Sequence, residues 1–274
     1  MLLQFGFSPC PNDTFMFWAW VHRKLDVELE VSPQLHDIQR LNQLALESAS
    51  LPLTKVSMAT FLEPRIMNEY RLLSSGAALG RGCGPLVVSQ GGSHSGPIRL
   101  AIPGRNTTAC KLAEMALGEQ VKEWVELRYD EIMPAVLAGK VDAGVIIHES
   151  RFVYHDLGLE CAFDLGAWWE EETGFPLPLG VMVARKELSD TVVAQVEVTL
   201  RNSISLAQSV MSGGDDEAKA SLWRYLRENA IEMEDSTMSS HIELYVNQFS
   251  LDLGDEGRAA IAEFEKRVLG GIQV

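Results

Sequence analysis

The stretch LLQFGFSPCPNDTF, residues 2–15, runs from a short apolar segment through a proline-rich turn into the start of a helix. Residues 2–7 are typical of a buried strand, because they form a short apolar run bounded by turn residues. The turn ends at Asn12 and Asp13, either of which is expected to cap a helix that reaches about His22. This order of strand, loop and helix is the repeating unit of α/β proteins.

Two series of such units follow one another along the chain. In the first, strands are expected at residues 29–31 and 53–58, and Asp37 is expected to cap a helix ending near Leu46. A polar, glycine-rich stretch at residues 91–96 is a hinge candidate. The second series has its expected strands and helices at residues 99–102, 109–117, 124–127, 130–138 and 143–147. This alternation predicts an α/β fold with largely parallel sheets.

The two series predict two lobes. A strand at residues 179–184 is expected to return to the first lobe, and the later chain is expected to be helical, with Asp190 starting a long amphipathic helix. Lobe 1 then comprises residues 1–92 and 179–274, and lobe 2 is the inserted segment 93–178. Ligands of such a protein are expected in the cleft between the lobes, at the carboxyl ends of strands and at helix N-termini.

The composition describes a globular protein with an unevenly placed acidic charge. The chain has 274 residues, 46% of them hydrophobic, and its 23 basic and 38 acidic side chains give a net charge of -15. Residues 1–100 hold 8 basic and 8 acidic side chains, so residues 101–274 carry the whole excess. Nucleic acids and anionic membrane surfaces are therefore not expected as partners.

The cysteines carry no metal or redox signature. They are widely spaced, with no C-x-x-C pair and no adjacent histidine cluster, and lie at Cys10, Cys83, Cys110 and Cys161. No metal site is expected, and reduced thiols favour the cytoplasm. The first residues lack a basic segment followed by a long apolar one, so we expect no signal peptide, and no apolar run approaches membrane-spanning length.

His148 is the candidate general base. It follows the apolar strand expected at residues 143–147, which places it at a strand's carboxyl end, facing the cleft. An ordinary imidazole titrates near about 6.5 and accepts a proton at neutral pH. The alternative is a structural, hydrogen-bonded histidine. A zinc motif is excluded, because the next histidine, His155, is seven residues away rather than four.

Two segments are candidates for binding an anion. Lys55 and Ser57 alternate along one expected strand, so both side chains project to the same face. Thr107 and Thr108 start an expected helix, where hydroxyls and unpaired backbone N–H groups favour a carboxylate or phosphate. The alternatives are an exposed edge lysine and an ordinary helix cap.

Three further side chains are weaker candidates. Arg81, within a glycine-dense stretch, and Arg105, beside the threonine pair, can each bind a carboxylate through two N–H groups, or be ordinary surface arginines. Cys10 precedes a helix and is a candidate nucleophile, although a small buried packing residue is the simpler explanation.

Six segments resemble a known family. They are SPCPNDTF (8–15), LPLTK (51–55), GRGCGPLVV (80–88), PGRNTTA (103–109), IIHESRF (146–152) and DLGAWWE (164–170). Together they resemble the 1,4-dihydroxy-6-naphthoate synthases of the futalosine route to menaquinone, and the resemblance continues to about residue 252. The family's fold is similar to that of type II periplasmic binding proteins, which agrees with the two-lobe prediction.

The resemblance implies a lyase that needs no cofactor. It would convert cyclic dehypoxanthinylfutalosine, a small carboxylate, into 1,4-dihydroxy-6-naphthoate with release of a sugar-derived fragment. His148 matches the family's proton acceptor. The substrate-binding positions implied or expected are Asn12, Lys55, Val56, Ser57, Arg81, Thr107, Thr108 and Ala109.

Two other functions remain open. A solute-binding protein of a transporter has the same fold and performs no chemistry. Chorismate dehydratase of the same pathway also resembles this fold and needs a carboxylate site. The segments around His148 and Cys10 favour the synthase, and the absence of a recognisable signal peptide disfavours the transporter protein.

Overall fold

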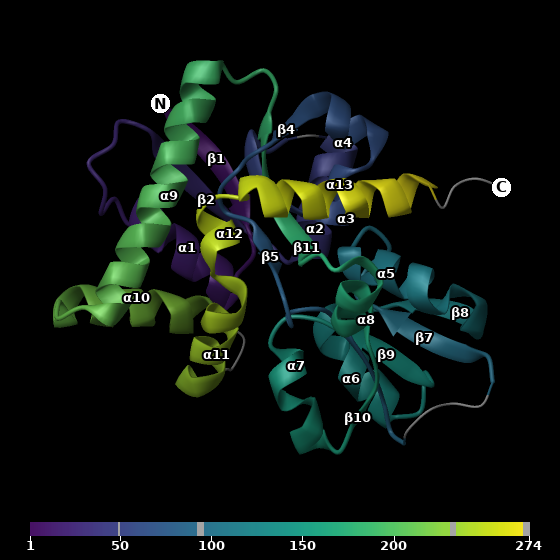
Figure 1. Ribbon diagram of the computed structural model, residues 1–274. Coiled ribbons are helices and arrows are strands. Elements are labelled where there is room, and N and C mark those ends of the chain that lie inside the picture. Colours follow the sequence, from purple (N-terminus) through teal and green to yellow (C-terminus); the bar gives the residue numbers. More distant parts are fainter. Residues whose placement is uncertain (49, 92–95, 231–233, 271–274) are drawn as a thin grey trace.

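The computed structural model describes residues 1–48, 50–91, 96–230 and 234–270. It contains two sheets, each flanked by helices, which form two halves of the molecule side by side (Figure 1). Residues 92–95 of the predicted hinge, with the predicted lobe boundary at 92 and 93, lie outside the described residues. The predicted α/β class is confirmed.

The first sheet has the strand order β2-β1-β3-β11-β4, with β5 also paired to β11. Its strands are β1 (Leu2–Phe7), β2 (Glu30–Leu35), β3 (Leu53–Ser57), β4 (Tyr70–Leu72), β5 (Ala78–Gly80) and β11 (Leu177–Arg185). β1 pairs in parallel with β2 and β3, whereas β11 runs antiparallel to β3, β4 and β5. The sheet is therefore mixed rather than largely parallel, because β11 re-enters it from the other half of the molecule.

The second sheet has the order β10-β6-β9-β7-β8. Its strands are β6 (Leu86–Ser89), β7 (Ile98–Ile102), β8 (Val121–Glu126), β9 (Ala143–Ile146) and β10 (Glu160–Asp164). β7 pairs in parallel with β8 and β9, while β6 pairs antiparallel with β9 and β10. The predicted boundary had placed Leu86–Ser89 in lobe 1. Its pairing with two strands of the second sheet puts it there instead, so we propose that the chain first crosses between lobes before β6.

Helices cover both sheets. In the first half they are α1 (Pro11–Val21), α2 (Ile38–Ser48), α3 (Met58–Phe61), α4 (Pro64–Glu69), α9 (Asp190–Ser212), α10 (Asp216–Asn229), α11 (Asp235–Tyr245), α12 (Gln248–Leu251) and α13 (Gly254–Gly270). In the second half they are α5 (Thr108–Leu117), α6 (Tyr129–Leu137), α7 (Ser150–Val153) and α8 (Leu165–Thr173), with short 3-10 turns η1 (Gly118–Gln120) and η2 (Tyr154–Leu157). Among the described residues, no helix is long and apolar enough to cross a membrane.

The opening stretch forms the centre of the first half. Helix α1 is apolar around most of its circumference, as expected for a helix buried on several sides. It contacts α9, α10 and α11, which lie around it in Figure 1. Phe5 and Phe7 of β1 meet Phe17 of α1 with ring centroids 4.8 and 5.2 Å apart. This packing holds the turn between β1 and α1 against the middle of the molecule.

The start of α1 differs from the prediction. The helix begins at Pro11, with Cys10 as N-cap, so Asn12 and Asp13 lie inside its first turn and do not cap it. Proline suits the first helical position, because its fixed φ is already helical and its missing N–H has no partner to lose there. The carboxylate of Asp13 instead accepts hydrogen bonds from the backbone N–H (3.1 Å) and hydroxyl (2.8 Å) of Ser8.

Other predicted caps are confirmed. The hydroxyl of Thr107 accepts a hydrogen bond from the N–H of Cys110 at 3.1 Å, which starts α5. Oδ1 of Asp37 accepts one from the N–H of Arg40 at 3.0 Å, at the start of α2. Both signals are local in sequence, so they do not depend on the tertiary packing.

The acidic excess lies at the surface. Among the described residues, Asp13 is the single buried acid and Lys55 the single buried lysine or arginine. The first turns of the C-terminal helices carry exposed acids such as Asp216, Glu217 and Asp255. This distribution is the usual one, because ionised side chains are rarely buried unless they are paired.

The chain segment that enters the second sheet passes very close to the start of α8. A Cβ atom added at Gly84 would lie 2.1 Å from Cα of Gly166, which is backbone and cannot rotate away. We predict that Gly84→Ala lowers the free energy of unfolding by about 1–3 kcal/mol through this overlap. Urea unfolding measures it, with Gly118→Ala as the control, because no atom lies within 4 Å of that added Cβ. Equal stability of the two variants would contradict the prediction.

Candidate functional site

A cavity lies between the two sheets and encloses about 630 Å³, including the open space at its mouth. The first half contributes Ser8, Asn12, Asp13, Ile38, Lys55, Ser57, Ala78, Leu179, Gly180, His241 and Tyr245. The second half contributes Cys83, Pro85, Thr107, Thr108, Ala109, Ile147 and His148. The cavity therefore lies between the lobes, at strand ends and helix starts, where the sequence predicts that ligands bind.

Most of the predicted site residues meet at this cavity, and two do not. Those that line it are Asn12, Lys55, Ser57, Thr107, Thr108, Ala109 and His148. Val56 is fully buried in the core on the opposite face of β3, as alternation along a strand requires. Arg81 is exposed and does not line the cavity. Its guanidinium donates to the carbonyl of Gly174 (3.0 Å) and to Glu256 (2.9 Å).

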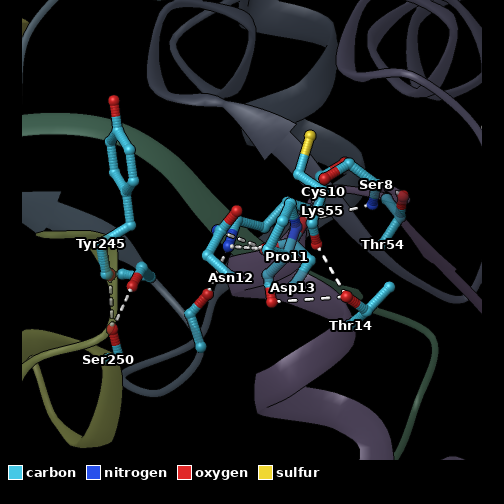
Figure 2. A network of polar contacts seen from close by, with 12 residues as sticks. Ser8, Cys10, Pro11, Asn12, Asp13, Thr14, Thr54, Lys55, Tyr245 and Ser250 are labelled. Atoms are coloured by element: carbon cyan, nitrogen blue, oxygen red, sulfur yellow. Dashed lines mark hydrogen bonds and ion pairs between the residues drawn. The ribbon is translucent and has the colours of Figure 1, made fainter. Parts of the chain in front are cut away.

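Lys55 is a buried ion-pair partner rather than an exposed edge lysine. Its ammonium donates to Oδ1 of Asp13 at 2.9 Å and to the carbonyl of Gly76 at 2.7 Å, and both charged side chains are 3% exposed. Figure 2 shows the pair at the turn between β1 and α1. An ammonium has three N–H donors. These two acceptors leave one donor for a ligand in the cavity.

Hydrogen bonds fix the hydroxyls on the anion-binding side. The Ser57 hydroxyl accepts from the Asn42 amide (2.9 Å), which in turn accepts from the Ser57 N–H (2.8 Å). The Thr108 hydroxyl donates to the carbonyl of Leu179 (2.7 Å) and accepts from the N–H of Ala59 (3.2 Å), so it ties α5 to the first sheet. The Thr107 hydroxyl satisfies the N–H of Cys110, whereas the earlier N–H groups at a helix start have no partner within the helix, and Thr108 and Ala109 of this start line the cavity.

His148 stands two residues after β9, in a backbone conformation that side chains rarely adopt. Its φ is 57°, in the left-handed region that histidine enters at a cost of about 1–2 kcal/mol. Its ring contacts Tyr129 edge-on, with centroids 5.4 Å apart. Within the part of the chain that the structure describes, its Nε2 is buried and has no hydrogen-bond partner. Strained residues of this kind cluster at functional sites.

The surroundings keep the His148 imidazole neutral. Burial lowers its pKa from the ordinary value, and the carboxylates of Glu149, Asp13 and Asp37 oppose that shift only in part. A neutral imidazole with an unpaired nitrogen can accept a proton. The alternative of a structural, fully hydrogen-bonded histidine does not fit this geometry.

The remaining weak candidates lie outside the cavity. Burial raises the pKa of the Cys10 thiol well above its ordinary value, and Glu149 adds to the shift, so the thiol stays protonated and is a poor nucleophile. Arg105 is exposed and does not line the cavity.

Sequence reasoning missed a second histidine at the site. His241 of α11 lines the cavity, is 1% exposed and lies parallel to His148, with ring centroids 6.5 Å apart and planes inclined by 16°. Tyr245, one helical turn later, contacts it at 4.7 Å between centroids. Helical spacing puts both on one face of α11, but no sequence pattern shows that this face meets the cleft.

The fold and the cavity together define a bilobed α/β protein with a cavity between its lobes. Solved structures place it in the periplasmic-binding-protein-like fold. A ligand-binding component of an ABC-type import system from Staphylococcus aureus aligns over 99% of this chain and 91% of its own, with a TM-score of 0.70 at 12% identity. The alkanesulfonate-binding protein SsuA from Xanthomonas axonopodis pv. citri aligns over 98% and 94%, with a TM-score of 0.65 at 14% identity.

Closer relatives are menaquinone enzymes. The family model described as menaquinone biosynthesis matches residues 3–269. A 1,4-dihydroxy-6-naphthoate synthase of Thermus thermophilus is 46% identical over 95% of this chain and 91% of its own, and one of Streptomyces coelicolor is 39% identical over 94% and 90%. The chain belongs to this menaquinone biosynthesis family, alongside the 1,4-dihydroxy-6-naphthoate synthases. An Archaeoglobus fulgidus protein of known structure is 32% identical, with a TM-score of 0.87 over 99% of this chain and 98% of its own.

Proposed function

We propose that the chain converts cyclic dehypoxanthinylfutalosine into 1,4-dihydroxy-6-naphthoate in the cytoplasm, with His148 as the proton acceptor. The observation that carries the proposal is the neutral, half-buried His148 imidazole, whose Nε2 is buried without a partner among the described residues and whose ring lines the cavity. The names of the two curated relatives support the same reaction.

The cavity offers a place for each part of such a substrate. Its carboxylate would lie at the start of α5, where the first N–H groups of the helix and the Ser57 hydroxyl, which accepts from Asn42 and keeps its own proton, would donate to it. The Thr107 hydroxyl donates to the carbonyl of Gly104 at 2.7 Å and holds the helix start in place. The remaining N–H of Lys55 adds a positive charge nearby. Apolar side chains of Ile38, Ile147 and Leu179 would contact the flat ring system.

The chemistry needs little from the protein beyond a base and hydrogen-bond donors. His148 takes a proton from a hydroxyl of the sugar-derived part, and the electron pair left on that oxygen forms a carbonyl as the adjacent carbon–carbon bond breaks. The electron pair of the broken bond enters the ring system. The sugar-derived fragment departs, and the ring that remains is aromatic. N–H and hydroxyl donors that face the substrate's oxygens stabilise the negative charge that develops in this step.

Incubation with two substrates tests the proposal. Purified protein should release 1,4-dihydroxy-6-naphthoate from cyclic dehypoxanthinylfutalosine, followed by absorbance and mass, and leave chorismate unchanged. Conversion of chorismate instead would assign the dehydratase activity. Tight binding of the first compound without turnover would assign a solute-binding role, the function of the sulfonate-binding neighbours.

The pH profile of the reaction follows from the lowered pKa of His148. The base works in its neutral form, so activity persists as long as the pH stays above the pKa of the folded site. We predict that kcat/KM keeps its plateau as the pH falls through about 6.5, the ordinary histidine value, and declines only at lower pH. Initial rates between neutral and acidic pH measure this, with tryptophan fluorescence confirming that the fold persists. An acidic limb centred above the ordinary value would contradict it.

A further inference from the structure

His241 is a second buried imidazole in the cavity that the proposed reaction does not use. It lies in α11 of the first half, whereas His148 belongs to the second half, and the two rings are nearly parallel. Its Nε2 lies 3.0 Å from Oδ1 of Asn12, and its Nδ1 is buried with no hydrogen-bond partner in the described ranges.

The neighbours of His241 determine which nitrogen carries its proton. The amide Nδ2 of Asn12 donates to Oδ1 of Asp13 at 3.0 Å, and a carboxylate only accepts. Asp13 is itself held by the Lys55 ammonium and by Ser8, so this direction is set by a buried ion pair (Figure 2). The Oδ1 of Asn12 is then the acceptor, and Nε2 of His241 must be the donor.

The other nitrogen of His241 therefore keeps its lone pair. Burial, with a smaller contribution from the neighbouring His148, lowers the pKa of the ring to about 3, so the ring holds a single proton near neutral pH. With that proton on Nε2, Nδ1 is an unprotonated acceptor. A buried acceptor without a partner is unfavourable, and a donor that arrives with a ligand would satisfy it.

We propose that Nδ1 of His241 accepts a hydrogen bond from a hydroxyl group of the substrate and so determines which end of the substrate lies beside α11. The proposal rests on the proposed function above. A carboxylate has no proton to donate and is repelled by the lone pair. The hydroxyl-bearing, sugar-derived end of the substrate therefore lies at His241, and the carboxylate lies at the start of α5.

Two conservative variants separate this role from a structural one. In His241→Gln the side-chain amide reaches the position of Nε2, so the bond to Asn12 is kept and the acceptor at Nδ1 is lost. In His241→Asn the amide reaches only as far as Nδ1, so the acceptor is kept and the bond to Asn12 is lost. We expect the Gln variant to lose about tenfold in kcat/KM, chiefly through KM, and the Asn variant to lose less.

A ligand without hydroxyl groups provides the matched control. 2-Naphthoate has the aromatic ring and the carboxylate alone, so its inhibition constant should be the same for the wild-type chain and His241→Gln. Wild-type activity in the Gln variant, equal or larger losses in the Asn variant, or equal weakening of naphthoate and substrate would each overturn the proposal. A wild-type chain that does not convert the substrate would instead overturn the proposed function, and this proposal with it.

Discussion

His148→Asn should lower kcat for cyclic dehypoxanthinylfutalosine by at least about a hundredfold, because a positioned general base contributes about 10²- to 10⁴-fold to such reactions. An amide has no nitrogen that titrates near neutral pH. Asparagine is the variant of choice because the φ of 57° at this position lies in a region that asparagine tolerates better than alanine does. Product formation at saturating substrate, followed by mass, measures the effect.

The control for His148 is a histidine in the same segment. His155 is exposed, lies seven residues further along and does not line the cavity, so His155→Ala should leave kcat unchanged. Circular dichroism and thermal unfolding show whether each variant is folded. A folded His148→Asn or His148→Ala with wild-type turnover would rule out the histidine as the base.

Lys55→Met should lower the free energy of unfolding by about 3–5 kcal/mol, because it leaves the carboxylate of Asp13 buried without its cation. Methionine keeps the volume and the apolar stem of lysine, so the loss reports the charge rather than a cavity. In a chain of this size the expected fall in Tm is about 10 °C. Thermal and urea unfolding measure both quantities.

Two comparisons identify the cause of that loss. Lys55→Met combined with Asp13→Asn removes both charges and should recover part of the stability, since no unpaired charge then stays buried. Glu30→Gln breaks the exposed ion pair with Arg23 and should cost no more than about 1 kcal/mol. If Lys55→Met costs as little as Glu30→Gln, the buried pair does not stabilise the fold.

The positions of the main elements follow from local patterns. The apolar run at residues 2–7 forms β1, the threonine at 107 caps α5, and Asp190 opens a long helix that covers the first half. Because side chains alternate along β3, Lys55 and Ser57 lie on the face that meets the cavity and Val56 lies on the face that meets the core. Each of these features depends on residues a few positions apart, so the sequence alone predicts it.

Most differences between prediction and structure concern contacts between distant residues, whereas Val56, expected to bind substrate, faces the core because of the local alternation along β3. Leu86–Ser89 belongs to the second sheet because it pairs antiparallel with β9 and β10. Arg81 does not line the cavity, and its guanidinium donates instead to Glu256, which lies 175 residues away in the chain. Asp13 lies inside the first turn of α1, and its carboxylate binds Lys55, which lies 42 residues away in the chain.

The amino-acid sequence by itself determined the α/β class, the two-lobe design and the placing of His148 at the end of a strand, because hydrophobic period and helix caps are local. It also carried the family resemblance, since the motifs are continuous. Only the tertiary structure decided that Lys55 is buried against Asp13, and that His241 meets Asn12 across 229 residues of chain. The proton on His241 depends on that network, and a network of distant side chains exists only after folding.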